Sequence, residues 1–510
     1  MPAADIVLKN ARVMTMDAAR PVAWLVAVEG DTVSFVGGPE DMESVIGAGT
    51  RVIDGGGRAV VPGFNDVHLH LFSLVRKLMS IDLSPASVRS IADIKEKIRV
   101  RVQKTPPGTW ISGTGYNEFY LAEKRRPTRR DIDEVAPDHP VVLSHRSLHE
   151  GVLNSPALAL AGITAATEEP AGARIERDPA TGEPNGIITG MLGKIYHEII
   201  PPLTDAELNK GISLVSRRFL SMGITSAQDA TASNSLERWE TVCGLVLDGR
   251  LRTRTSLMAG ASYWKDFQAV GLKTGSGDNL MRLGAVKVMP EIQPDQAALN
   301  GLALDAHRAG FQLAFHAVDE DTIAAVIEAL EYVDNRSRVK GRRHRIEHCA
   351  ECPPSLLERI KKLGAVIVTQ PPFIYSSGER YLATVPQGQL PWLYRIKAPL
   401  ESGVVVAGSS DAPVAPENPL VGVYSAVTRR AESGQVLLPG ERITVNQALA
   451  LYTVNAACAS FEEGVKGSIA PGKLADLVVL SADPTKIPPE QIKDVKVDMT
   501  IIGGEVVWEA

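Results

Sequence analysis

Both ends of the chain consist of short apolar runs separated by turn residues, which is the pattern of β-strands in an all-β domain. At the C-terminus, residues 474–480 form one run, and residues 499–502 and 505–508 flank Gly503-Gly504 as in a hairpin. The N-terminal runs occupy residues 6–8, 12–16, 24–28 and 32–36. Because such strands occur at both ends with different material between them, we predict one composite β-sandwich domain from residues 1–60 and 465–510.

Between these ends, apolar strands alternate with amphipathic helices, a pattern that predicts βα units around a parallel sheet. Helices are expected near residues 204–222, 296–309 and 320–334. The predicted strands lie at residues 61–68, 140–145, 224–229, 283–289, 311–316, 345–348, 365–370 and 404–408. This repeated pattern predicts an α/β fold, a distorted (β/α)₈ TIM barrel over residues 61–464.

The barrel region is longer than this fold requires. A (β/α)₈ barrel typically takes about 250 residues, and the predicted first and last strands enclose clearly more chain. The surplus falls within residues 71–200, which contain a charge-rich stretch at 123–130 and a turn-like segment at 178–186. We therefore expect an inserted subdomain after strand one that lies over the barrel mouth.

Composition narrows the class of partner. The 510 residues carry a net charge of -6, so there is no basic excess to favour nucleic acid or an anionic membrane surface. Four scattered cysteines do not suggest a disulfide framework, and we find neither a signal peptide nor a membrane-spanning run. We expect a cytoplasmic protein with a small-molecule substrate and no nucleic-acid or membrane partner; a homodimer is left open.

The first predicted barrel strand runs into His68-Leu69-His70. Residues two apart on a strand point to the same side, so two imidazoles there can face one metal ion. Taken alone, such a pair is more commonly two polar or solvated histidines. Barrel enzymes place their catalytic residues at the carboxyl ends of the strands. At the ends of later predicted strands the sequence offers four more candidates: Lys287, His316, His348 and Asp411.

Each of these four residues has a simple alternative role. His316 and His348 could be core histidines with satisfied hydrogen bonds, and Asp411 could be a helix N-cap. A lysine in a buried strand is costly unless it is paired, so Lys287 requires an explanation even alone. Taken together the alternatives weaken, because all six metal- or proton-competent side chains fall where a barrel would bring them together.

The candidate side chains suit a centre of two divalent ions. His68 and His70 would bind one ion, and His316 and His348 would bind the other. A bridging ligand is then needed, for which a neutral lysine is poor. A Lys287 carboxylated by CO₂ would supply two oxygens and a negative charge, which would also explain its burial.

Such a centre predicts a hydrolytic mechanism. The metals would lower the pKa of a bridging water to about 7 and polarise a carbonyl oxygen. Asp411 would take the proton from the attacking hydroxide and pass it to the leaving group. Zinc, manganese or iron would suit this ligand set.

Longer motifs around these residues allow a comparison with known families. They lie at residues 62–70, 154–158, 184–186, 343–348, 408–413 and 467–477. As a set they resemble the amidohydrolase superfamily, in the branch of YtcJ-like and AepA-like proteins that includes N-substituted formamide deformylase. The resemblance covers nearly the whole chain.

The resemblance implies a metal-dependent distorted barrel, a composite β-sandwich and hydrolysis of amide-like C–N bonds. It implies that Lys287 is carboxylated and that Asp411 is the general base. The metal ligands implied in this way are His68, His70, Lys287, His316, His348 and Asp411.

The chain departs from that branch after Lys287, where residues 288–291 replace a common Phe/Ala-Asp-Gly segment. We therefore expect an altered substrate pocket in which Glu291 is either a polar pocket group or a surface residue. His149 matches a histidine that relatives place near the substrate, and we assign it a catalytic role in orienting the carbonyl, with a plain loop histidine as the alternative. His145 is a less supported candidate of the same kind. The remaining candidate substrate-binding residues are Trp110, Tyr116, Phe373 and Arg395.

The leading hypothesis is a metal-dependent amidohydrolase acting on a carbon–nitrogen bond other than a peptide bond. Amides, N-formyl compounds, carbamates and cyclic amides are the substrate classes to consider. A lyase or hydratase that uses the same metal centre on a small carbonyl compound is an alternative, because fold does not fix function. A non-catalytic regulatory relative is a third reading, and the complete set of candidate ligands argues against it.

Overall fold

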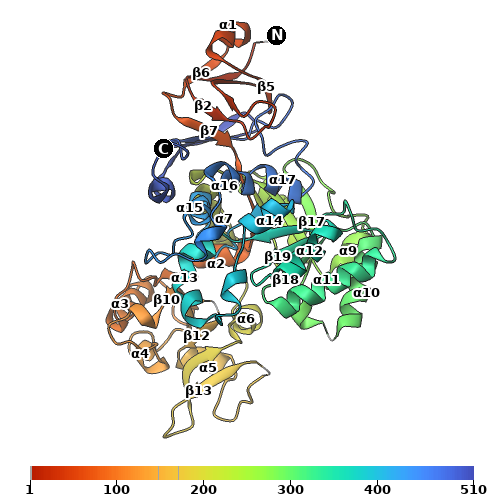
Figure 1. The fold of residues 1–510 in the computed structure, drawn as a ribbon. Helices are drawn as coiled ribbons and strands as arrows, with labels where there is room; N and C mark the ends of the chain where they lie inside the picture. Colours follow the sequence, from red (N-terminus) through yellow and green to blue (C-terminus); the bar gives the residue numbers. More distant parts are fainter. Residues whose placement is uncertain (1–2, 148, 171, 294) are drawn as a thin grey trace. The chain divides into compact units, whose positions relative to one another are not determined.

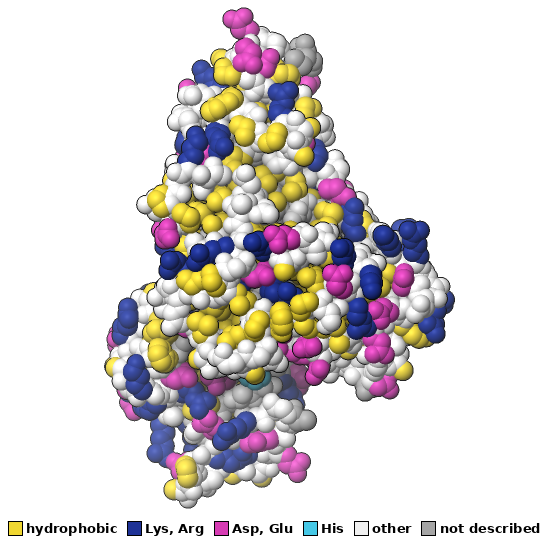
Figure 2. Space-filling model, in the orientation of Figure 1, with side chains coloured by type: hydrophobic (Ala, Val, Ile, Leu, Met, Phe, Trp, Pro, Cys, Tyr) yellow, Lys and Arg dark blue, Asp and Glu magenta, His cyan; other side chains and the backbone are white. Residues whose placement is uncertain are grey.

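A computed structural model describes residues 3–147, 149–170, 172–293 and 295–510. The chain forms two compact units (Figure 1): Met1–Leu71 together with Ser216–Ala510, and Phe72–Val215. Acidic and basic side chains are interspersed on the face drawn in Figure 2, in keeping with 54 Lys and Arg against 60 Asp and Glu. Among the described residues, no helix combines the length and apolar character that crossing a membrane requires.

The larger unit contains the predicted barrel, an eight-stranded parallel sheet in the order β21-β20-β19-β18-β17-β16-β15-β8. The segment after β21 closes it against β8, because Asp411 N donates to His68 O at 2.8 Å and His70 N donates to Ala412 O at 2.8 Å. The strands are β8 (Phe64–Leu69), β15 (Ile224–Asp229), β16 (Arg254–Gly260), β17 (Met281–Val288), β18 (Leu313–Ala317), β19 (Arg345–His348), β20 (Val366–Thr369) and β21 (Val406–Gly408). The distorted TIM barrel is thereby confirmed.

One predicted barrel strand was wrong and one was missed, so the number of strands was correct by compensation. Residues 140–145 correspond to β11 (Val141–His145), which belongs to a separate six-stranded sheet. The missing barrel strand is β16, which begins with three polar residues, Arg254-Thr255-Ser256. All three are buried, and the charge of Arg254 is paired with Asp476, 222 positions away, through Nε to Oδ2 at 2.7 Å. A local pattern cannot show that such a polar strand is internal.

Amphipathic helices accompany the barrel strands. In α11 (Glu320–Asp334) the buried residues recur at helical spacing, as at Ile323, Val326 and Ile327, and Asp319 caps its first turn through the backbone N–H of Thr322. Further helices of the chain include α7 (Asp205–Ser221), α8 (Leu236–Leu247), α10 (Gln296–Arg308), α12 (Pro354–Leu363), α13 (Pro372–Thr384), α15 (Pro419–Thr428), α16 (Val445–Leu451) and α17 (Val454–Ala459).

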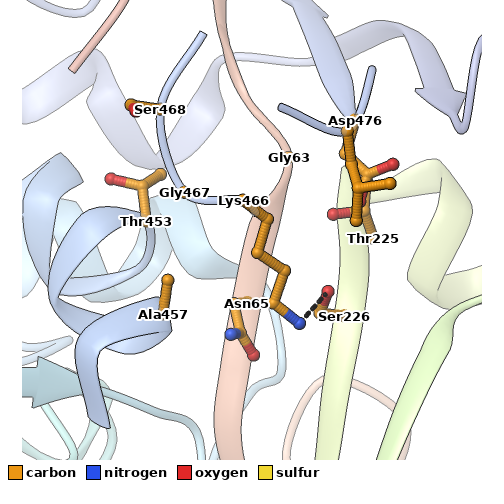
Figure 3. Close-up of a pocket in the computed structure, with 11 residues that line it drawn as sticks. Gly63, Asn65, Thr225, Ser226, Thr453, Ala457, Lys466, Gly467, Ser468 and Asp476 are labelled. Atoms are coloured by element: carbon orange, nitrogen blue, oxygen red, sulfur yellow. Dashed lines mark hydrogen bonds between the residues drawn. The ribbon is translucent and has the colours of Figure 1, made fainter. Parts of the chain in front are cut away.

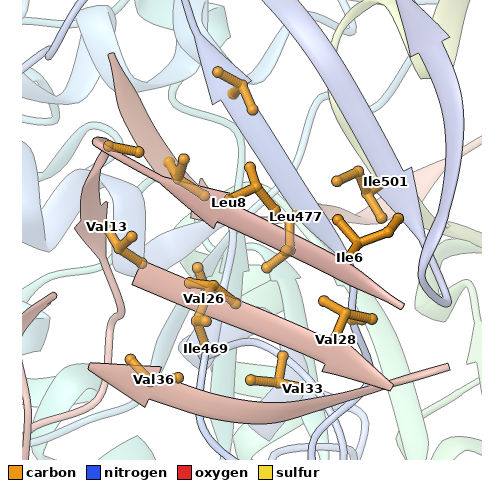
Figure 4. Packing of buried hydrophobic residues seen from close by; sticks show 14 of the residues in the cluster. Ile6, Leu8, Val13, Val26, Val28, Val33, Val36, Ile469, Leu477 and Ile501 are labelled. Atoms are coloured by element: carbon orange, nitrogen blue, oxygen red, sulfur yellow. The ribbon is translucent and has the colours of Figure 1, made fainter. Parts of the chain in front are cut away.

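The predicted composite β-sandwich is also present in the larger unit. A four-stranded sheet consists of β1 (Ile6–Lys9), β4 (Leu25–Glu29), β5 (Thr32–Gly37) and β6 (Arg51–Asp54). A six-stranded sheet combines both ends of the chain in β2 (Arg12–Met14), β3 (Val22–Ala23), β7 (Ala59–Pro62), β22 (Leu477–Leu480), β23 (Val497–Ile502) and β24 (Glu505–Glu509). Side chains from both sheets, including Leu8, Val26, Leu477 and Ile501, form one buried core (Figure 4). Strand β7 leads into β8 and so fixes the start of the barrel.

The smaller unit is built on its own six-stranded mixed sheet, in the order β13-β14-β12-β11-β10-β9. Its strands are β9 (Ile81–Asp82), β10 (Ile111–Tyr116), β11 (Val141–His145), β12 (Glu150–Leu153), β13 (Arg174–Arg177) and β14 (Pro184–Thr189). Helices α3 (Ile91–Val102), α4 (Arg129–Asp133) and α5 (Ser155–Leu160) belong to the same unit. This is the expected insertion after strand one; that it covers the barrel mouth stays a prediction.

Candidate metal centre

The His-x-His pair lies at the carboxyl end of β8, and Asp411 lies just after β21. Asp411 Oδ1 is 3.0 Å from His70 Nε2 and 3.6 Å from His68 Nε2. His68 and Asp411 are buried, and the His70 side chain is 26% exposed. The two histidines therefore face one carboxylate, and all three can offer an atom to a common ion.

Three further predicted residues lie beside this group. Lys287 Nζ, on β17, is 3.4 Å from His68 Nε2. The His348 ring, at the end of β19, has its centroid 5.0 Å from that of His68 and 4.5 Å from that of His316 on β18. The structure thus brings together all six side chains that the sequence placed at strand ends. Their roles as ligands stay predictions.

The outer nitrogens of three imidazoles are held by neighbouring side chains. His348 Nδ1 lies 2.8 Å from Gln370 Oε1, and His68 Nδ1 is in close contact with Glu347. His70 Nδ1 lies 3.1 Å from the hydroxyl of a threonine. These contacts leave each Nε2 as the atom that faces the shared space. His348 Nε2 is buried and has no hydrogen-bond partner among the described residues.

This arrangement fits a bound divalent metal. Ligating histidines normally hold their second nitrogen against a carboxylate, carbonyl or similar acceptor, which fixes the ring and its tautomer. A buried imidazole nitrogen without a partner is costly, and an ion would supply one. Histidine nitrogens with a carboxylate suit zinc, manganese or iron.

The electrostatics of the site favour the protonation states that ligands need. Burial lowers the pKa of His348, holds that of His68 well below its ordinary value, and lowers that of His316 to about 3, so these rings are neutral near pH 7. Burial also lowers the pKa of Lys287, which favours the uncharged amine that can react with CO₂. Burial alone would raise the pKa of Asp411, but it is outweighed by opposing influences, of which the hydrogen bond from His70 is the largest, and the pKa is lowered.

A buried ion pair beneath the site was not predicted from the sequence. Glu347 Oε1 accepts from Arg345 Nε at 2.7 Å, Glu347 Oε2 accepts from Arg345 Nη2 at 3.0 Å, and the same carboxylate contacts His68. The Arg345 and Glu347 side chains are 1% and 0% exposed. Arg345 also donates to the backbone oxygen of Val67 at 2.8 Å. The available signal was two charged residues at alternate positions of an otherwise apolar strand, which burial tolerates only when they are paired.

Predicted substrate residues fall in both units. Glu291 is exposed after β17, and its Oε1 lies 3.7 Å from His316 Nε2, so it is next to the site. Phe373 lies in a buried aromatic and aliphatic cluster of the larger unit. Arg395 donates to the backbone oxygen of Cys352 at 2.5 Å and lies against Trp392. In the smaller unit, His149 is exposed, Trp110 is half-buried and Tyr116 is buried. A joint pocket of these two sets stays a prediction.

A second polar space lies at the opposite, amino-terminal ends of the barrel strands (Figure 3). Gly63 and Asn65 line it from the start of β8, and Ser226 lines it from the start of β15. Lys466 Nζ donates to Ser226 Oγ at 3.0 Å. Polar contacts at the amino-terminal end of such a barrel serve stability, whereas the active sites of barrel enzymes lie at the carboxyl ends of the strands. We therefore assign the chemistry to the histidine site.

Comparison with known proteins identifies the class. The Amidohydrolase family model matches residues 51–508, and the chain belongs to this family. The chain is 29% identical to the N-substituted formamide deformylase of Arthrobacter pascens, covering 99% of this chain and 98% of that protein. It is 26% identical to the putative amidohydrolase YtcJ of Bacillus subtilis, covering 95% and 96% of the two chains.

A solved structure also shares the fold. An uncharacterized metal-dependent hydrolase from Pyrococcus horikoshii superimposes with a TM-score of 0.76 at 21% identity, covering 95% of this chain and 99% of that chain. This likeness supports the barrel and sandwich. Family membership together with the clustered histidine and aspartate groups supports a hydrolytic enzyme with a divalent metal.

Proposed function

We propose that the chain is a metal-dependent hydrolase that cleaves an amide-type C–N bond, with N-formyl compounds, amides, carbamates and cyclic amides as substrate classes. The observation that carries the proposal is the convergence of His68, His70, His348 and Lys287 on one space beside the Asp411 carboxylate. A divalent metal held there would acidify a water and polarise the scissile carbonyl.

Asp411 is the proposed proton carrier. Its pKa lies below the ordinary value, so the group is an ionised acceptor near neutral pH. It is buried, and Oδ1 points toward the histidines at 3.0 and 3.6 Å rather than into solvent. In this position the carboxylate would accept a proton from the attacking water and return it to the leaving nitrogen.

Lys287 is proposed to carry a carbamate. The neutral Nζ amine would form a bond to the carbon of CO₂ and release one proton, giving an N-carboxylate in place of the amine. The side chain is 2% exposed and burial lowers the pKa of its amine, so the neutral nucleophile is accessible to this reaction. The product charge would offset the otherwise unfavourable burial of a lysine among ligands.

The substrate would carry an apolar group next to the amide. Phe373 and Tyr394 have ring centroids 5.7 Å apart within the buried cluster of the larger unit. Burial, the neighbouring Tyr381 and, to a smaller extent, the Asp411 carboxylate all raise the pKa of Tyr394. The cluster is therefore close enough to the proposed centre to sense the charge of Asp411. The relative named N-substituted formamide deformylase makes N-substituted formamides the first class to test.

The test is a hydrolysis screen of N-substituted formamides, primary amides and carbamates with zinc-replete and chelated protein. We expect metal-dependent release of the amine from at least one class. Asp411→Asn should lower turnover by about 10²–10⁴-fold while the metal stays bound; Asp321→Asn, at an exposed aspartate, is the matched control. Full activity of Asp411→Asn would refute its role, and no hydrolysis of any class would refute the proposed reaction.

A further inference from the structure

The smaller unit contains a second group of metal-competent side chains, none of which belongs to the barrel. Strands β10 and β11 are parallel, and β12 returns antiparallel to β11. The carboxyl ends of β10 and β11 and the start of β12 therefore meet at one edge of the sheet. Glu118 follows β10, His145 ends β11, and Glu150 begins β12. Sheet pairing alone brings these three residues together.

Their donor atoms lie at distances suited to a shared ion. Glu118 Oε2 is 3.4 Å from His145 Nε2, and Glu150 Oε1 is 3.5 Å from His145 Nδ1. One ligand atom from each residue lies within 4.8 Å of the others. Ligand atoms that each bind a zinc ion at about 2.0–2.2 Å have separations of this order.

Unpartnered buried atoms indicate that a ligand is missing from this group. Glu118 Oε2 and His145 Nε2 are inaccessible to solvent and have no hydrogen-bond partner among the described residues. Tyr116 is fully buried, and its hydroxyl also has no hydrogen-bond partner in the described part of the chain. Its ring meets that of His145 edge-on at 5.4 Å. After burial, the charges of Glu150 and Glu118 contribute most to raising the pKa of Tyr116, so its hydroxyl shares their surroundings.

The surrounding charges leave room for a cation. Arg126 Nη1 donates to Glu150 Oε2 at 3.0 Å, and the same guanidinium binds Glu176, so one arginine is shared by two carboxylates. The other oxygen of this carboxylate, Glu150 Oε1, lies beside His145. Burial lowers the pKa of His145, and with the smaller effects of Arg126 and Arg146 it outweighs the charges of Glu118 and Glu150, which raise that pKa. Among the ion pairs of the described residues, Glu118 pairs with His145 and with no lysine or arginine.

The histidine has a tautomer that suits an ion. His145 Nδ1 lies 2.8 Å from Ser147 Oγ and 3.1 Å from the backbone nitrogen of Ser147. With its proton on Nε2 the ring accepts from the Ser147 backbone; with the proton on Nδ1 it donates to the serine hydroxyl and leaves Nε2 free. The second form takes the Nδ1 acceptor away from the Ser147 backbone N–H, and a cation bound at Nε2 would have to offset that loss.

We propose that Glu118, His145 and Glu150 form a second divalent-cation site, with the Tyr116 hydroxyl as a neighbouring oxygen. One imidazole with two carboxylates suits zinc or manganese. The ion would join the ends of β10 and β11 to the start of β12, and so fix the strand ends next to the predicted catalytic residue His149. The site does not depend on the chemistry proposed for the barrel.

The test is the zinc content of the full chain after chelation, zinc addition and removal of free metal. Glu118→Gln and His145→Asn should each lose one zinc per chain relative to wild type. Glu168→Gln, at an exposed glutamate of the same unit, should lose none. Zinc should also raise the unfolding temperature of wild type more than that of Glu118→Gln. For each protein, this rise is measured relative to its own metal-free state.

Lys287→Ala separates this proposal from that for the barrel. That variant should lose barrel zinc and keep the zinc that Glu118→Gln removes, so the two losses should add in the combined variant. Equal zinc content in wild type, Glu118→Gln and His145→Asn would overturn the second site whatever the barrel binds.

Discussion

Glu347→Gln tests whether the buried ion pair beneath the histidines supports the metal centre. The substitution preserves size but replaces one carboxylate oxygen by an NH₂ group. One of the two Arg345 hydrogen bonds, at 2.7 and 3.0 Å, then faces a donor, and the contact to His68 Nδ1 loses its charge. Because Arg345 is only 1% exposed, its guanidinium would remain buried without a compensating anion.

The expected magnitudes follow from that burial. Removing one partner of a buried ion pair costs about 3–5 kcal/mol, and removing the group that orients a ligating histidine weakens metal binding by about 10–100-fold. The free energy of unfolding of metal-free protein in urea measures the first quantity. Competition with a chromophoric zinc chelator measures the second.

A matched surface pair provides the control. Glu331 accepts from Arg359 in the same two-bond geometry, at 2.8 and 2.7 Å, but these side chains are 41% and 36% exposed. Glu331→Gln should cost less than about 1 kcal/mol and leave zinc affinity unchanged. If Glu347→Gln matched this control in both measurements, the proposed coupling between the ion pair and the metal ligands would be wrong.

Two further predictions concern stability. Burial raises the pKa of Asp131, but hydrogen bonds led by Arg125 outweigh it and lower the pKa to about 2; Asp131→Asn should therefore cost about 1 kcal/mol at pH 7 because solvent screens the pair. A carboxylate with a lowered folded-state pKa contributes stability above pH 3.8, and this contribution is lost as the pH falls toward 2. The stability difference between wild type and Asp131→Asn, measured by urea unfolding, should therefore shrink across that range; a constant difference would contradict this prediction. Gly422→Ala should destabilise the protein by about 1–3 kcal/mol, because the added methyl group would clash with buried Tyr452. Gly244→Ala has open space around it and should stabilise its helix by up to about 1 kcal/mol. Equal shifts of the unfolding temperature in the two variants would refute the packing argument.

The parts of the fold that could be predicted are those in which local pattern and burial agree. Strand β20 is an almost continuous apolar run, because parallel barrel strands are covered on both faces. Strand β11 has the same pattern but belongs to the smaller unit, since an apolar run does not specify its sheet. Strand β16 was missed because the partner that makes its Arg254 tolerable lies at Asp476, in a distant part of the chain.

The site residues that could be predicted are those whose positions follow from the fold topology. The strand-end rule brought out the histidines, Lys287 and Asp411, because it depends on fold topology rather than exact packing. Gln370 and Glu347 were missed because their contacts to His348 and His68 depend on packing between strands. The Glu118 cluster depends on the pairing of three strands within an insertion whose sheet the sequence did not predict.

The central claim is that barrel side chains hold a divalent metal centre, and bound metal tests it most directly. Wild type and a His68→Asn, His348→Asn double variant should be stripped of metal, reconstituted with zinc and analysed for zinc per chain. Because both proteins keep the smaller unit unchanged, the difference between wild type and the double variant reports barrel zinc alone. We predict that the double variant loses the zinc bound in the barrel while keeping its fold by circular dichroism. Equal zinc content in a folded double variant would contradict the claim.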